Sequence, residues 1–198
     1  QEWLKKSESI PRKHGLYRME AILEALGNPE RKLKSIHIAG TNGKGSTAAM
    51  ITAFAKAHGL RVGTFTSPHM DVIRERIQLD GVPLEEEPFW QAASVVREVE
   101  HRLFEEWGAF NYFEILTAMM FVVFQQEAVD LAIIEVGIGG LLDNTNVGHP
   151  LVSVITTIGL DHQDLLGSTL EEITAQKAGI IKSGQQVVVG PVTGECMD

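Results

Sequence analysis

The stretch SIHIAGTNGKGST, residues 35–47, decides the fold. Its apolar part, Ser35–Ala39, has the length of a buried strand, and a helical pattern begins at Lys44. The glycines between them let backbone N–H groups converge on phosphate oxygens, while the helix N-terminus and Lys44 add positive charge. A hydroxyl of Ser46 or Thr47 can lie near a magnesium ion. We therefore expect a nucleotide's phosphates to be bound by Thr41, Asn42, Gly43, Lys44, Gly45, Ser46 and Thr47.

This loop departs from the usual P-loop pattern. That pattern has four residues between its glycines and places Ser or Thr directly after the lysine, where this chain has Gly45. The alternative is a tight strand-to-helix turn without a ligand. The combination of glycines, lysine and hydroxyls between a strand and a helix favours phosphate binding.

Strand and helix patterns alternate along the chain. Short apolar runs predict buried strands at Ser35–Ala39, Val62–Phe65, Leu131–Glu135, Val152–Thr156 and Gln186–Val189. Helical patterns cover Leu16–Leu26, Lys44–His58, Glu86–Glu106, Phe113–Glu127 and Thr169–Lys182. This alternation predicts an α/β domain with a mostly parallel sheet and helices on both faces. With the phosphate loop, the expected fold is P-loop NTPase-like.

The last predicted helix has clear start and stop signals. Ser168 and Thr169 are N-cap candidates with glutamates at capping-box spacing, and Gly184 is a plausible stop. Ile173, Lys177 and Ile181 are spaced by four and share one face, so Lys177 falls within an apolar stripe.

Composition limits the classes of partner. The 198 residues carry a net charge of −9 with a pI near 5.3, which disfavours nucleic acid and anionic membranes. The longest apolar stretch, Ile115–Phe124, is too short to span a bilayer, and Gln1–Lys13 lacks the apolar region of a signal peptide. Cys196 is the single cysteine, so no internal disulfide forms. We expect a cytoplasmic protein that acts on small molecules, as a monomer.

Polar residues follow three of the predicted strands. Ser67 comes after the second strand, Glu135 ends the third, and Asp161 and His162 follow the fourth. Because ligands of open α/β sheets bind at the carboxyl ends of the strands, we expect these side chains near the phosphate loop. Oxygen ligands there suit magnesium. Alternatively, Glu135 is solvated and Asp161-His162 forms an ordinary turn.

Lys177 admits two interpretations. It can extend to solvent, or burial can lower its pKa so that the neutral amine takes up carbon dioxide near bound metal. The second outcome is a carbamate, a metal-binding anion.

These residues carry a resemblance. The chain resembles the N-terminal ATPase domain of folylpolyglutamate and dihydrofolate synthases, in the Mur ligase superfamily. The Gly-Lys-Gly-Ser ending of the loop is specific to this folate branch. The matching segments run in order at residues 15–19, 36–46, 66–69, 113–114, 135–137, 142–146, 159–162 and 177–182.

The resemblance implies a reaction and site residues. ATP would phosphorylate the carboxylate of a folate or of dihydropteroate, and L-glutamate would attack the acyl phosphate. Lys44 would hold the phosphates. One magnesium ion would take Ser67 and Glu135, and a second would take His162 and a carbamylated Lys177. Phe113 and Asp143 match the positions that bind the pterin ring in bifunctional members of the family.

At three positions the residue differs from the one usual in the family. These differences bear on which acceptor is bound more than on the reaction. Leu141 stands where Arg is usual, Asn144 where Ala is usual, and Asn111 where Thr is usual. Family members are also longer. We therefore expect residues 1–198 to be an incomplete central domain that lacks the C-terminal Rossmann-like domain and does not turn over alone.

Three other functions stay open. A P-loop kinase or NTPase would share Lys44 but would not need Lys177. A non-catalytic nucleotide-binding module would bind MgATP without turnover. A Mur-type ligase for cell-wall precursors is disfavoured by Gly45 and by the Ser67-Pro68-His69 segment.

Overall fold

The structure is a computed structural model that describes residues 2–11 and 15–192. Cys196 lies outside the described residues. The centre of the described structure is a seven-stranded sheet in the order β4-β3-β2-β5-β1-β6-β7. The strands are β1 (Ser35–Ala39), β2 (Val62–Phe65), β3 (Ile77–Leu79), β4 (Val82–Pro83), β5 (Leu131–Glu135), β6 (Val152–Ile155) and β7 (Gln186–Val189).

The sheet is mostly parallel, as predicted. β2, β5, β1, β6 and β7 pair in parallel, while β3 and β4 form an antiparallel hairpin against β2. β6 ends one residue before the predicted Thr156. The prediction that β7 is buried was wrong: all four of its residues are exposed, because β7 is the edge strand of the described sheet.

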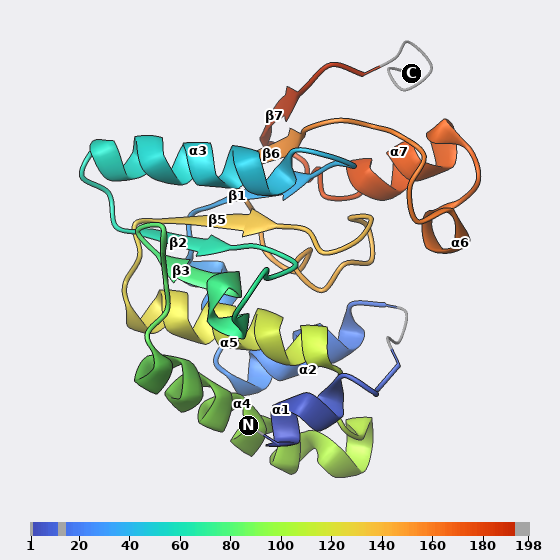
Figure 1. Cartoon of the computed structure of the whole chain (residues 1–198). Coiled ribbons are helices and arrows are strands. Elements are labelled where there is room, and N and C mark those ends of the chain that lie inside the picture. Colours follow the sequence, from blue (N-terminus) through green and yellow to red (C-terminus); the bar gives the residue numbers. More distant parts are fainter. Residues whose placement is uncertain (1, 12–14, 193–198) are drawn as a thin grey trace.

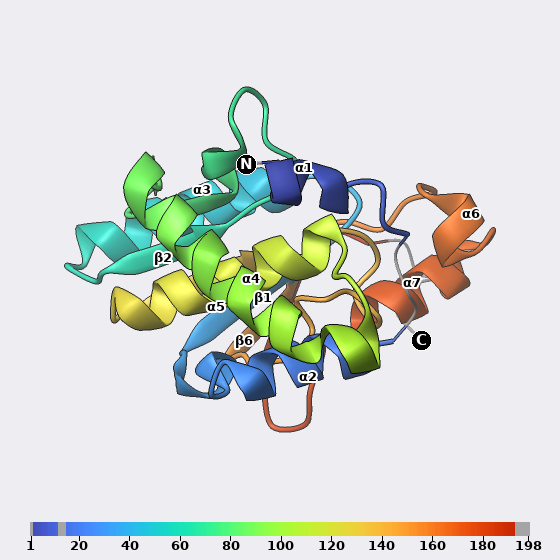
Figure 2. The same ribbon diagram turned by 90° about the horizontal axis from the view of Figure 1, so that it is seen from below.

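Helices cover both faces of the sheet (Figure 1). The longer helices are α2 (Tyr17–Ala25), α3 (Lys44–Ala57), α4 (Glu86–Trp107), α5 (Tyr112–Gln126) and α7 (Leu170–Ala178). Short helices not predicted from the sequence are α1 (Glu2–Ser7), α6 (Gln163–Leu166), η1 (Pro29–Lys32) and η2 (Ile73–Arg76). Figure 2 shows α4, α5 and α2 crossing beneath the sheet, on the face opposite α3.

The main core lies between the sheet and α5. The segment from Phe113 to Phe124 is buried throughout, since α5 is covered by the sheet on one side and by α2 and α4 on the other. A smaller hydrophobic cluster, which includes Ile38, Ala48 and Ile133, packs α3 against the opposite face of the sheet. This places the start of α3 at the carboxyl edge of the strands.

A buried ion pair joins α2 to α5. The side chains of Arg18 and Glu114 are each 2% exposed, and Arg18 Nε donates to Glu114 Oε1 at 2.8 Å. Glu114 also accepts from Asn111 N at 2.8 Å in a capping box at the start of α5. Removing one partner of such a pair typically costs about 3–5 kcal/mol, because the other charge stays buried.

The end of α7 differs from the prediction. The helix ends at Ala178 rather than Lys182, and Ile181 is 38% exposed beyond it. The cause is the loop after β5: Leu141 N donates to Gln176 O at 2.7 Å, and Asn146 Nδ2 donates to Gly179 O at 3.0 Å. These bonds occupy carbonyls that a further turn would need. The predicted start is confirmed, with Thr169 and Glu172 as the capping box.

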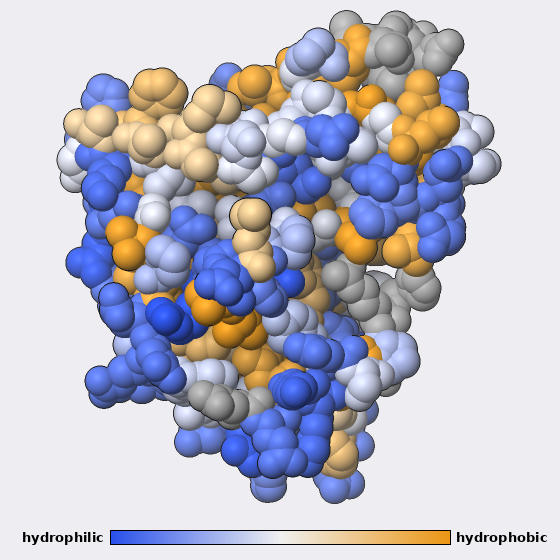
Figure 3. Space-filling view, viewed as in Figure 1, coloured by the Kyte–Doolittle hydropathy of each residue, from blue (hydrophilic) through white to orange (hydrophobic). Residues whose placement is uncertain are grey.

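Two further features concern the surface. Apolar side chains, including Met50 and Phe54, gather on the outer face of α3 (Figure 3). Among residues 2–11 and 15–192, no helix is both long and apolar enough to cross a membrane.

Candidate functional site

The phosphate loop connects β1 to α3 and is pinned to the segment after β6. Thr41 N donates to Thr157 O at 2.8 Å, and Thr41 Oγ1 donates to Gly159 O at 3.1 Å. A Cβ at Gly40 would lie 1.9 Å from Thr156 Oγ1, so this position requires glycine. The loop is therefore held from both β1 and β6.

Lys44 lies over this loop. Its ammonium donates to Gly40 O at 3.0 Å and Thr41 O at 3.3 Å. Gly43, the N-cap residue of α3, has φ of 82° and places no side chain over the helix end. The first N–H groups of α3 and the Lys44 charge thus lie together, the arrangement that binds polyphosphate.

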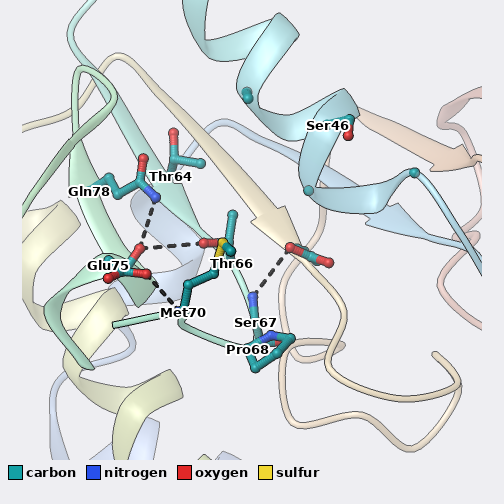
Figure 4. Close-up of a pocket in the computed structure, with 12 residues that line it drawn as sticks. Ser46, Thr64, Thr66, Ser67, Pro68, Met70, Glu75 and Gln78 are labelled. Atoms are coloured by element: carbon teal, nitrogen blue, oxygen red, sulfur yellow. Dashed lines mark hydrogen bonds between the residues drawn. The ribbon is translucent and has the colours of Figure 1, made fainter. Parts of the chain in front are cut away.

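A cavity of about 410 Å³ opens beside the loop, at the carboxyl ends of β2 and β5 (Figure 4). The phosphate loop contributes Gly43, Gly45 and Ser46 to its wall, and Ala49 of α3 lies next to them. The opposite wall is formed by Thr64, Thr66, Ser67, Pro68, Met70, Glu75, Gln78 and Glu135.

Glu135 and Ser67 are in direct contact in this cavity. Ser67 N donates to Glu135 Oε2 at 3.3 Å, and Glu135 is only 3% exposed. Burial raises the pKa of Glu135, opposed by the Ser67 N–H and by the charges of Lys44 and Arg76. The alternative that Glu135 is simply solvated is wrong.

The oxygens around Glu135 are of the kind that magnesium takes. The Glu135 carboxylate shares the cavity with the residues Ser46, Thr66 and Ser67, each of which carries a hydroxyl. Within the described ranges, no group of three or more His, Cys, Asp or Glu residues is placed to hold a metal ion. A cation here would therefore depend on hydroxyl and phosphate oxygens as well as on Glu135.

A second, narrow recess also borders the phosphate loop. It is lined by Gly40, Lys44, Asp161, His162 and Lys177 together with residues 136–139. His162 has φ of 49°, and its N–H donates to Asp161 Oδ1 at 2.9 Å, so the local turn does form. The turn and the recess are compatible, because the same turn places His162 in the recess wall.

Lys177 does not extend to solvent. The residue is 3% exposed, beside Ile173 on the buried face of α7. Burial, followed by the charge of Lys44, lowers the pKa of Lys177 to about 8, and Asp161 opposes this shift. A fraction of this amine is therefore neutral near pH 7, which is the condition for reaction with carbon dioxide.

Phe113 and Asp143 meet over Gly137. A Cβ at Gly137 would lie 2.6 Å from Phe113 Cζ and 3.1 Å from Asp143 Oδ2, so the two side chains flank one bare stretch of backbone. Asp143 Oδ2 accepts from Ile138 N at 3.1 Å, while Oδ1 accepts from Thr145 N and Oγ1. The structure thus brings together both residues expected near the pterin.

Two of the unusual residues have local roles. Asn111 Oδ1 accepts from Phe113 N and Glu114 N, each at 3.0 Å, and so caps α5. Asparagine is a preferred N-cap residue, so the departure at this position preserves the helix start. Leu141 is 43% exposed, and its side chain lies against Gly179.

The wall that Thr66, η2 and β3 give to the large cavity was not predicted from the sequence. Thr66, Glu75 and Gln78 line this wall, and Glu75 accepts backbone N–H bonds from residues 70–72. The sequence does carry a signal for β3: the Asp80-Gly81 pair, typical of hairpin turns, lies between the short segments that form β3 and β4.

Fold and site together define a P-loop-like α/β domain. No family model matches the chain. It is 44% identical over 187 residues to the dihydrofolate synthase/folylpolyglutamate synthase of Bacillus subtilis, covering 93% of this chain and 44% of that protein. With the folylpolyglutamate synthase of Lacticaseibacillus casei it shares 47% identity over 175 residues, 87% of this chain and 41% of that protein.

A solved structure agrees with these relatives. The complex of folylpolyglutamate synthase (FPGS) with AMPPCP and folate superposes with a TM-score of 0.93 at 43% identity, over 99% of this chain and 49% of that one. The chain therefore belongs to the folylpolyglutamate synthase and dihydrofolate synthase family, and it spans somewhat less than half the length of these relatives.

Proposed function

We propose that this chain is the ATP-binding part of an enzyme that joins L-glutamate to a folate, to dihydropteroate, or to both. The observation that carries the proposal is the position of Glu135 beside the phosphate loop at the strand ends: a Cβ at Gly45 would lie 3.6 Å from Glu135 Oε2, and the charge of Lys44 acts on this carboxylate. Cation and carboxylate in one site suit a nucleotide–magnesium complex. The bound AMPPCP and folate of the related FPGS structure support both the nucleotide and the acceptor class.

The proposed reaction has two chemical steps. An oxygen of the acceptor carboxylate attacks the γ-phosphorus of ATP, the bond to the bridging oxygen breaks, and ADP leaves with that electron pair. The glutamate amine then attacks the acyl carbon, phosphate leaves, and the amine gives up a proton as the amide forms. Lys44 and the N–H groups at the N-terminus of α3 bind and orient the phosphates through both steps.

Two magnesium sites belong to the proposal. Ser67 and Glu135 would hold one ion, and the oxygen-rich cavity wall around them fits this role. His162 and a carbamate of Lys177 would hold the other, which the shared recess and the lowered Lys177 pKa support. Such ions neutralise charge on the nucleotide and the acceptor carboxylate.

The pterin would lie against Phe113 with Asp143 accepting its N–H groups. Gly137 lets Phe113 and Asp143 lie close together against the backbone, because any side chain at this position would meet both residues. We further propose that residues 1–198 are the incomplete central domain of a longer enzyme, since its relatives are about twice as long.

Product analysis of the full-length enzyme tests this function. We expect mass spectrometry to detect an acceptor extended by one glutamate only when MgATP, glutamate and dihydropteroate or tetrahydrofolate are all present. ATP hydrolysis without any extended product would instead favour a P-loop NTPase. Binding of MgATP without hydrolysis would favour a non-catalytic module.

A further inference from the structure

A buried hydrogen-bonded chain leads from Asp143 into the sheet. Thr145 Oγ1 donates to Asp143 Oδ1 at 2.6 Å, and Thr145 N donates to the same oxygen at 3.1 Å. His37 Nε2 lies 2.8 Å from Thr145 Oγ1. His37, Asp143 and Thr145 are between 2% and 4% exposed, so bulk water does not compete for these bonds.

Hydroxyl chemistry decides the direction of the chain. A threonine hydroxyl has a single hydrogen, and the short bond to an ionised Asp143 uses it. Thr145 Oγ1 must then accept from His37, which requires a hydrogen on Nε2. His37 is thereby fixed as the tautomer that donates from Nε2, and each residue in the chain donates toward Asp143.

The position of His37 supports a neutral ring. His37 lies in the middle of β1, between Ile134 of β5 and Ser153 of β6. Burial, with a further contribution from the charge of Lys182, lowers the pKa of His37 to about 3. A neutral imidazole keeps one nitrogen hydrogen and can still donate to Thr145.

We propose that His37 and Thr145 are positioning residues that hold the Asp143 carboxylate oriented toward the acceptor. This inference rests on the proposed function, because it assumes that Asp143 recognises the pterin. Neither residue touches the acceptor. Asp143 acts through orientation: with Oδ1 held by Thr145 and Oδ2 held by Ile138 N, the carboxylate cannot rotate away from Gly137.

These hydrogen bonds also predict which acceptor molecules the site binds more tightly. An ionised carboxylate accepts hydrogen bonds and cannot donate them. The heterocycle must therefore present N–H groups toward Asp143, as an amino-pyrimidinone ring does. A ring with acceptor atoms at the same edge would meet like charge and bind poorly.

The test compares Thr145→Val with Thr145→Ser in the full-length enzyme. Valine keeps the shape and removes the hydroxyl, while serine keeps the hydroxyl. We expect Thr145→Val to raise the KM for tetrahydrofolate or dihydropteroate about tenfold, the effect of losing a hydrogen bond to a charged group. The KM for ATP should stay within about twofold, and Thr145→Ser should behave like the parent.

A second readout does not depend on turnover. Nitrogen-15 NMR of labelled histidine should show His37 protonated at Nε2 alone near neutral pH, with that resonance changed in Thr145→Val. Equal damage from serine and valine, or an equal rise in both KM values, would overturn the proposal in favour of a packing role. ATP turnover by the parent enzyme that does not depend on the acceptor would contradict the proposed function. The NMR result would then still show whether His37 donates to Thr145 as inferred.

Discussion

The backbone N–H of Ser67 donates to Oε2 of Glu135 at 3.3 Å, joining the segment after β2 to the end of β5. Glu135 is also near the loop, since a Cβ at Gly45 would lie 3.6 Å from the same oxygen. The carboxylate therefore lies between the phosphate loop and the cavity wall.

This position makes Glu135 a test of the magnesium proposal. Glu135→Gln keeps the side chain's size but removes its charge, so we expect the magnesium concentration for half-maximal activity to rise about tenfold or more. Titrating magnesium at fixed ATP measures this. The exposed Glu86 at the start of α4 provides the control, Glu86→Gln, which should leave the titration unchanged. An unaltered titration in Glu135→Gln would remove Glu135 from the metal site.

The carbamate proposal predicts a dependence on carbon dioxide. With a pKa of about 8, roughly one Lys177 amine in ten is neutral at pH 7, against fewer than about one in a thousand for an ordinary lysine. We expect activity to fall in carbon-dioxide-depleted buffer and to return with bicarbonate. Lys177→Met should lose activity and show no response to bicarbonate, while Lys56→Met should respond like the parent. An enzyme indifferent to carbon dioxide would contradict the carbamate.

Adding a methyl group at Gly137 tests the proposed acceptor site. In Gly137→Ala the new methyl group would meet Phe113 and Asp143, so we expect the KM for the pterin acceptor to rise about tenfold with little change for ATP. Gly148→Ala is the matched control, since nothing lies within 4 Å of a Cβ there. Steady-state kinetics with each substrate varied separates the two effects. A selective loss of ATP affinity would place the pterin elsewhere.

The buried His37 predicts how stability depends on pH. Its pKa is lowered from 6.5 to about 3, so the unfolded chain binds a proton before the folded protein does as the pH falls. The contribution is fully present above about pH 6.5 and is lost between that pH and about 3. We expect the free energy of unfolding to decrease by about 1 kcal/mol from this group between about pH 7 and pH 5.5.

Denaturant unfolding at these two pH values checks the expectation. The decrease should be smaller by that amount in His37→Gln, whose side chain does not titrate. His58→Gln, at the exposed end of α3, should keep the parent's pH dependence. The same decrease in the parent and in His37→Gln would show that His37 titrates normally in the folded protein.

The strands and the phosphate loop could be predicted because their signals are local. Apolar runs gave four of the five predicted strands their observed bounds, and the glycines around Lys44 mark the loop without any long-range contact. Glu135 and Ser67 could be expected at one edge because parallel strands end together.

The rest depends on contacts between distant residues. The early end of α7 follows from bonds donated by Leu141 and Asn146, which no pattern around residue 178 reveals. His37 and Thr145 are 108 residues apart, and a histidine in an apolar strand gives no sign of its partner. The β3–β4 hairpin was missed because its strands have three and two residues.

Phosphate release from MgATP by the full-length enzyme, with glutamate present, tests the central claim most directly. One sample would contain dihydropteroate, one tetrahydrofolate and one neither acceptor, with Lys44→Ala and Lys56→Ala measured in parallel. We expect release that requires an acceptor, falls at least about a hundredfold in Lys44→Ala and is unchanged in Lys56→Ala. Release that ignores the acceptor, or that survives Lys44→Ala, would contradict a folate–glutamate ligase built on this loop.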